Sequence, residues 1–98
     1  MAAFQVSSSE LKAKANELRD LNGQFKSQIG ELETKEVSLV SKYKGASSDA
    51  FDARFKEEKN QMDNFYNLIE QYCVALDNIA AEYYKAEMQA VAIAQSRA

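Results

Sequence analysis

Residues 51–93 read FDARFKEEKNQMDNFYNLIEQYCVALDNIAAEYYKAEMQAVAI and carry the most regular hydrophobic pattern in the chain. Its apolar residues recur at alternating spacings of four and three, which is the period of one face of an α-helix. The series consists of Phe51, Phe55, Glu58, Met62, Phe65, Ile69, Tyr72, Leu76, Ile79, Tyr83, Ala86, Ala90 and Ile93. Only Glu58 among them is charged, so the pattern predicts one long amphipathic helix over about residues 47–93.

A second helical pattern precedes the first. Ser7 and Glu10 have the spacing of a capping box, in which each side chain bonds the other residue's backbone N–H. A seven-residue repeat follows, formed by Leu11, Leu18, Phe25, Leu32 and Leu39, with Ala15, Ile29 and Tyr43 four residues beyond three of them. Asn22 and Glu36 occupy the alternate positions and would fix the register of the seam at some cost in stability. This pattern predicts a helix over about residues 8–42.

The two patterns are separated by Gly45 and a group of small polar residues. Gly45 suits the C-cap of the first helix at positive φ. Ser47 or Ser48 can cap the second helix, and Asp49 in its first turn would meet the partial positive charge of the helix N-terminus. We therefore expect a turn at about residues 43–47 and a single helical-hairpin domain spanning residues 1–98.

The composition agrees with long helices. The chain has no proline and three glycines, and 46% of its residues are hydrophobic. Alternation with a period of two does not occur at useful length, so we expect almost no β structure. The predicted fold class is all-α, an antiparallel two-helix hairpin. Gly23 and Gly30 lie on one side of the first helix, where they either admit a close partner helix or are tolerated exposed glycines.

A single hairpin seam cannot cover all of the apolar surface. The predicted seam contains Leu11, Leu18, Phe25, Leu32, Leu39, Phe55, Met62, Phe65, Ile69, Tyr72, Leu76 and Ile79. Further apolar residues flank it, namely Leu21, Val37, Val40, Tyr66, Leu68, Cys73, Ala80 and Tyr84. Because a long exposed apolar strip favours association, we predict a dimer that forms a four-helix bundle. The polar residues Asn22, Glu36 and Glu58 are compatible with either an identical or a paralogous partner.

Most kinds of chemistry are disfavoured by the composition. There is no histidine and one cysteine, so zinc sites and Cys-His or Ser-His nucleophiles are absent, and we expect neither catalysis nor a cofactor or metal. Glu58 is either a buried functional acid or an acid at the rim that pairs with Arg54. Cys73 is either a reactive thiol or a packed small hydrophobic residue, and its apolar flank favours packing.

Binding to nucleic acid or a membrane is also disfavoured. The net charge is −3, and no basic block attracts phosphate. The longest apolar run, residues 90–94, is far shorter than the roughly 20 residues of a membrane-spanning helix. Residues 1–6 contain neither a positive segment nor an apolar run typical of a cleavable signal peptide.

Three motifs carry a resemblance to a known family. Tyr43-Lys44-Gly45 lies near the middle of the chain, small polar residues lead from Ser47 into Phe51, and Tyr83 precedes Glu87 by four residues. In these motifs, its length and its hairpin pattern, the chain resembles the WXG-type (Esx, early secreted antigen-like) family of type VII secretion substrates. The family's Trp is replaced here by Tyr43, which keeps an aromatic body and a polar tip.

The resemblance implies a small non-catalytic protein made in the bacterial cytoplasm and secreted without a cleavable signal peptide. It implies export as a folded dimer, driven by the membrane ATPase of a type VII system, with the protein acting as effector or secretion partner. Tyr83 and Glu87 would be the secretion signal, and Tyr43 and Gly45 the turn motif beside the signal of the other protomer. The alternatives are a cytosolic helical adaptor or chaperone-like coiled-coil protein, and a membrane-active hairpin that the acidic balance disfavours.

Overall fold

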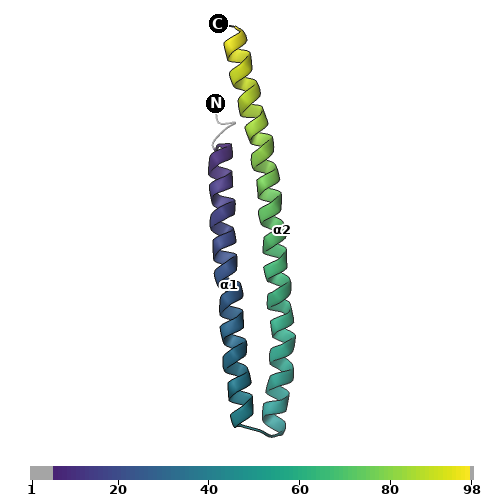
Figure 1. Cartoon of the computed structure of the whole chain (residues 1–98). Helices are drawn as coiled ribbons and strands as arrows, with labels where there is room; N and C mark the ends of the chain where they lie inside the picture. Colours follow the sequence, from purple (N-terminus) through teal and green to yellow (C-terminus); the bar gives the residue numbers. More distant parts are fainter. Residues whose placement is uncertain (1–5, 98) are drawn as a thin grey trace.

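The computed structural model describes residues 6–97 as two long antiparallel helices, α1 (Ser8–Lys42) and α2 (Ala46–Ser96). The helices lie side by side and are joined by a short turn at one end of the molecule (Figure 1). The hairpin measures 79 × 18 × 16 Å, and α2 extends past the beginning of α1 (Figure 1). Within the described residues there is no strand, and the all-α hairpin predicted from the sequence is confirmed.

The first helix begins at the residue that its capping signal predicts. Ser7 has extended backbone angles, φ −96° and ψ 166°, and its hydroxyl oxygen accepts the Glu10 N–H at 3.2 Å. The Glu10 carboxylate accepts a bond from the Ser7 hydroxyl at 3.3 Å instead of one from the Ser7 backbone N–H. The side-chain cap therefore forms as expected, whereas the return bond of the capping box goes to a different donor.

The turn differs from its prediction. The helix α1 closes at Tyr43, whose N–H donates to the Leu39 carbonyl at 3.1 Å. Gly45 is the residue before α2, and its φ of 157° with ψ of −179° is a conformation that side chains other than glycine rarely adopt. The C-cap of α1 is Tyr43 and not Gly45, although Gly45 has the expected positive φ. The predicted caps at Ser47 or Ser48 are wrong, because the N-cap of α2 is Gly45 without a side-chain cap, and the Ser48 hydroxyl donates to the Gly45 carbonyl at 2.9 Å. Asp49 lies in the first turn of α2, as expected.

The centre of the interface between the two helices is small and partly polar. We call its six buried residues the hairpin seam: Ala15, Asn22, Ile29 and Glu36 of α1, with Cys73 and Ala80 of α2. The large residues of the predicted seam are half-buried or exposed and line one side of this interface. The four buried residues of α1 all belong to the repeat predicted for the first helix, whereas in α2 the centre lies at Cys73 and Ala80, which were expected to flank the seam. Cys73 is fully buried, which agrees with its interpretation as a packed hydrophobic residue.

Hydrogen bonds across the seam fix the register of the hairpin. The Asn22 amide donates to the Tyr66 carbonyl at 3.1 Å and to the Glu70 carboxylate at 2.8 Å. On the side of the interface opposite the large residues, Asp77 pairs with Lys12 at 3.1 Å and with Arg19. A shift of one helix along the other would separate these partners, so the polar contacts select one alignment.

Candidate functional site

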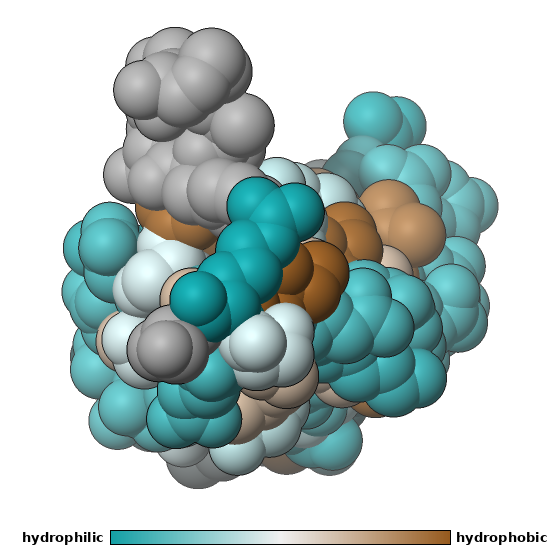
Figure 2. Space-filling model, turned by 90° about the horizontal axis from the view of Figure 1, so that it is seen from above, coloured by the Kyte–Doolittle hydropathy of each residue, from teal (hydrophilic) through white to brown (hydrophobic). Residues whose placement is uncertain are grey.

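The large apolar side chains gather on one long surface formed by both helices. We call it the apolar face: Leu11, Leu18, Phe25, Leu32, Leu39, Phe51, Phe55, Met62, Phe65, Ile69, Tyr72, Leu76 and Ile79. In a view along the molecule, hydrophobic side chains reach the surface between hydrophilic ones (Figure 2). Exposed fractions reach 53% at Phe65 and 57% at Tyr72, which lie about two turns apart on the same stripe of α2. The apolar face is therefore the main candidate for a protein contact.

The middle of the apolar face is organised around two phenylalanines. The rings of Phe25 and Phe65 meet edge to face, with centroids 5.9 Å apart and an interplanar angle of 85°. They line a shallow hollow of about 270 Å³ together with Leu18, Leu21 and Ile69. Because Phe65 belongs to α2 and Phe25 to α1, this contact joins the two helices. The Phe65 ring nevertheless stays open to solvent.

Glu58 is the one acid within the predicted stripe of α2, and it is half-buried. Its carboxylate accepts a bond from the Arg54 Nε at 2.8 Å, one turn earlier in the helix. The interpretation of Glu58 as an acid that pairs with Arg54 is therefore confirmed. Such a pair is compatible with the rim of a contact surface, since both groups reach solvent.

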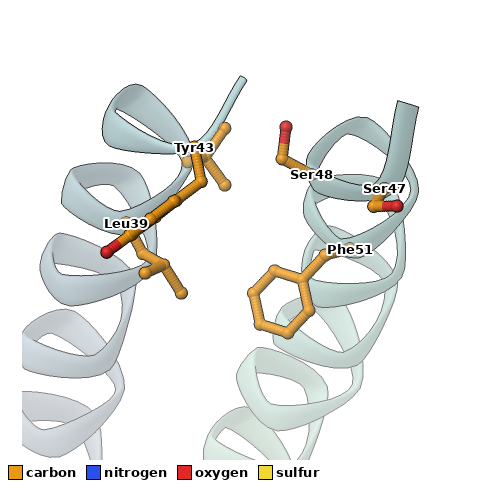
Figure 3. Close-up of a pocket in the computed structure, with 6 residues that line it drawn as sticks. Leu39, Tyr43, Ser47, Ser48 and Phe51 are labelled. Carbon is orange, nitrogen blue, oxygen red and sulfur yellow. The ribbon is translucent and has the colours of Figure 1, made fainter. Parts of the chain in front are cut away.

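A separate apolar pocket lies beside the turn. It has a volume of about 280 Å³ and is lined by Leu39, Val40, Tyr43, Ser47, Ser48 and Phe51. The Phe51 ring of α2 points toward the first helix, and the Tyr43 side chain, at the C-cap of α1, lies alongside Leu39 (Figure 3). Tyr43 is 66% exposed, so the aromatic residue in the position of the family's Trp is available for contact. We call this site the turn pocket.

Tyr83 and Glu87 lie far from the turn pocket, near the other end of the molecule (Figure 1). Both residues are half-buried. The Glu87 carboxylate accepts the Ser8 N–H at 2.9 Å and the Ser8 hydroxyl at 2.6 Å. The hydroxyl bond and then the backbone bond hold the pKa of Glu87 below its usual value of 4.5.

Ser8 is a functional candidate that the sequence pattern did not reveal. It is separated from Glu87 by almost the whole hairpin in sequence, and nothing in its neighbourhood indicates an acidic partner. The signal that could have found it is the register of the hairpin, which brings the first turn of α1 level with Glu87. That register depends on contacts such as the hydrogen bond from Asn22 to Glu70. The periodicity of each helix does not predict which residues of the two helices lie opposite one another.

Glu36 is the most unusual charged group of the hairpin seam. It is buried, and its Oε2 atom has no hydrogen-bond partner. Burial, followed by the hydrogen bond with Asp52, raises the pKa of Glu36 above its usual 4.5. The Lys56 ammonium, 2.8 Å from Asp52, is the main cause of a lowered pKa for Asp52. Of the two acids, Glu36 is therefore the one that favours the neutral form, whereas Asp52 favours the ionised form.

The two glycines of α1 are exposed, and a Cβ added at Gly23 or Gly30 would meet nothing within 4 Å. The hairpin itself therefore does not require glycine at these positions. Among residues 6–97, no 18-residue stretch of either helix is apolar enough to cross a membrane. In the same part of the chain, no three His, Cys, Asp or Glu side chains gather into a potential metal site.

The fold and its surface define a class of protein, the elongated two-helix hairpin with an apolar face along its length. The chain belongs to the family of proteins of 100 residues with WXG, whose model matches residues 3–88. A search of curated proteins found no match.

Among solved structures, the hairpin is similar to that of the secreted protein EsxB from Bacillus anthracis str. Sterne. A point mutant of EsxB is 27% identical over 87% of this chain and 96% of its own, with a TM-score of 0.77. The wild-type EsxB structure is 28% identical over 85% of this chain and 89% of its own, with a TM-score of 0.76. The similarity therefore extends over most of the hairpin.

Proposed function

We propose that this protein is a non-catalytic type VII secretion substrate that leaves the bacterial cell as a folded dimer and acts as effector or secretion partner. The observation that carries the proposal is the apolar face, in a chain of the WXG family. A monomeric soluble protein rarely exposes an apolar surface of this length. The secreted nature of EsxB supports the same assignment.

The geometry of the face favours a second copy of this hairpin as the partner. The stripe of Phe51, Phe65 and Ile79 has Phe65 at its midpoint. A two-fold axis at Phe65 would bring Phe51 of one protomer level with Ile79 of the other, so that the stripe covers itself. The product would be an antiparallel four-helix bundle, and a paralogous hairpin with the same stripe would fit as well.

The same axis would bring the turn of one protomer beside the signal of the other. Tyr43 would lie level with Glu87 of the other copy, although the two positions lie about 60 Å apart within one hairpin. The turn pocket and the pair Tyr83 and Glu87, which we call the export signal, would then form one composite surface. We propose that the membrane ATPase of the secretion system recognises this surface.

The dimer is tested by size-exclusion chromatography with light scattering at micromolar concentration. The expected mass is twice the 11.0 kDa of the chain. A stable monomer at that concentration would rule out export as a dimer of this chain, and the experiment is then repeated with paralogous hairpins.

Export is tested by fractionating cultures of the producing bacterium with and without its type VII membrane ATPase. We expect the protein in the supernatant only when the ATPase is present. Tyr83→Ala and Glu87→Ala should remain in the cell with unchanged helical circular dichroism, whereas Val74→Ala, an exposed apolar residue outside the signal, should be exported. Retention of the wild-type protein in the cytoplasm would support a helical adaptor instead.

A further inference from the structure

The beginning of α1 and the export signal are joined by two hydrogen bonds. Ser8 is the first residue of α1, and its N–H and hydroxyl donate to different oxygens of the Glu87 carboxylate. Ser7 accepts the N–H of Glu10. The N-terminus of α1 is thus capped by two side chains: Ser7, which directly precedes the helix, and Glu87 from α2.

The physical reason for this contact lies in the helix N-terminus. The first N–H groups of a helix have no acceptor within the helix, and the helix dipole favours a negative charge beside them. A carboxylate that accepts two donors from one residue is restricted in rotation, because both of its oxygens are engaged. Glu87 is accordingly held in one orientation, one helical turn beyond Tyr83.

We propose that Ser8 is a positioning residue of the export signal, which holds the Glu87 carboxylate in a fixed orientation beside Tyr83 for recognition. This inference rests on the proposed function. The lowered pKa of Glu87 agrees with it, because both Ser8 donors favour the ionised carboxylate. The recognised element is then larger than the two signal residues of α2 and includes the first turn of α1.

A series of substitutions at Ser8 removes the donors one at a time. Ser8→Thr keeps both donors, Ser8→Ala keeps the backbone N–H, and Ser8→Pro removes both. Proline fits this site because it is favoured at the first position of a helix. Ser7 already has the extended conformation that a residue before proline prefers.

The expected order of export is Ser8→Thr close to wild type, Ser8→Ala intermediate and Ser8→Pro lowest. We expect Ser8→Pro, which loses both bonds, to reduce the exported fraction by at least about tenfold, because loss of even one hydrogen bond to a charged group changes an equilibrium by about that factor. Carbon-detected NMR of the Glu87 side chain should show its pKa returning toward 4.5 in Ser8→Pro. A low pKa that persists in this variant would contradict the proposal.

The matched control is Ser7→Ala, which weakens the cap of α1 without removing a donor to Glu87. We expect Ser7→Ala to be exported like the wild type even though its thermal midpoint falls. Equal loss of export in Ser7→Ala and Ser8→Pro would overturn the proposal, because the effect would then come from the stability of α1 alone.

Two patterns of results separate this inference from the proposed function. If Tyr83→Ala and Glu87→Ala are exported normally, the export signal itself is wrong. If those two variants are retained while Ser8→Pro is exported as well as or better than the wild type, the signal stands and the positioning role of Ser8 is wrong.

Discussion

The hairpin seam and the apolar face differ in the residues they contain. The seam, which is buried within one chain, holds two alanines, a cysteine, an isoleucine, an asparagine and a glutamate. The apolar face, much of which is open to solvent, holds most of the large side chains, including Phe65, Tyr72 and Ile79. A stable isolated hairpin would be expected to have the reverse arrangement, since burial of large apolar groups is the main source of stability.

The difference indicates a division of tasks between the two surfaces. Small residues let the helices approach closely, and polar ones such as Asn22 select a single register. The large residues remain partly exposed in the single hairpin, so burying them in an interface with another molecule would release further hydrophobic free energy. Folding and dimerisation are therefore expected to be coupled, with stability that depends on protein concentration.

The largest effect is expected from a charge at the centre of the apolar face. Phe65→Glu removes an exposed ring and would bury a carboxylate in the dimer, so the dissociation constant should rise by at least about a hundredfold. Sedimentation equilibrium measures this change. Val74→Glu is the matched control, because Val74 is a similarly exposed apolar residue of α2 outside the face. A dimer that persists in Phe65→Glu would show that the face is not the interface.

A smaller effect is expected from a large side chain in the hairpin seam. Ala15 is fully buried, so Ala15→Leu must push the helices apart and should lower the free energy of unfolding by about 1–3 kcal/mol. Chemical denaturation at a fixed protein concentration provides the measurement. Ala13→Leu, at an exposed position of the same helix, should leave stability nearly unchanged. Equal stability of both variants would contradict the close contact at Ala15.

The smallest effect is expected from the buried acid of the seam. Because the pKa of Glu36 is raised in the folded protein, its protonated form contributes stability in acid that is lost as the pH rises through that pKa. Glu36→Gln should therefore raise the thermal midpoint by a few degrees at about pH 7, and this gain should shrink toward about pH 4.

The pH dependence of Glu36 must be separated from that of other acids. The pKa values of Asp77 and Glu87 are lowered, so their contributions are present above the usual 3.8 and 4.5 and are lost as the pH falls further. Comparison of thermal melts with Glu31→Gln, an exposed acid of α1, isolates the effect of burial. No gain for Glu36→Gln near neutral pH would mean that the Lys56 ammonium already compensates its charge, against the repulsion from Asp52 and Glu33.

The turn illustrates what local sequence can and cannot predict. Gly45 indicated the break correctly, because a glycine followed by small polar residues seldom lies inside a helix. Gly45 was predicted to be the C-cap of the first helix, whereas it is the N-cap of α2. The Ser48 hydroxyl donates to the Gly45 carbonyl instead of accepting a backbone N–H. Several cap arrangements suit the same residues, and the choice among them depends on how the two helix ends meet.

The sequence by itself determined that the chain forms two amphipathic helices, where they begin to within a residue or two, and which residues share a face. Only the tertiary structure decided how each helix is rotated toward the other. That rotation placed Ala15 and Cys73 inside, left Phe65 outside, and brought Ser8 to Glu87. The reason is that periodicity fixes the spacing of residues along one helix, whereas rotation and register depend on the sizes and hydrogen bonds of side chains from both helices.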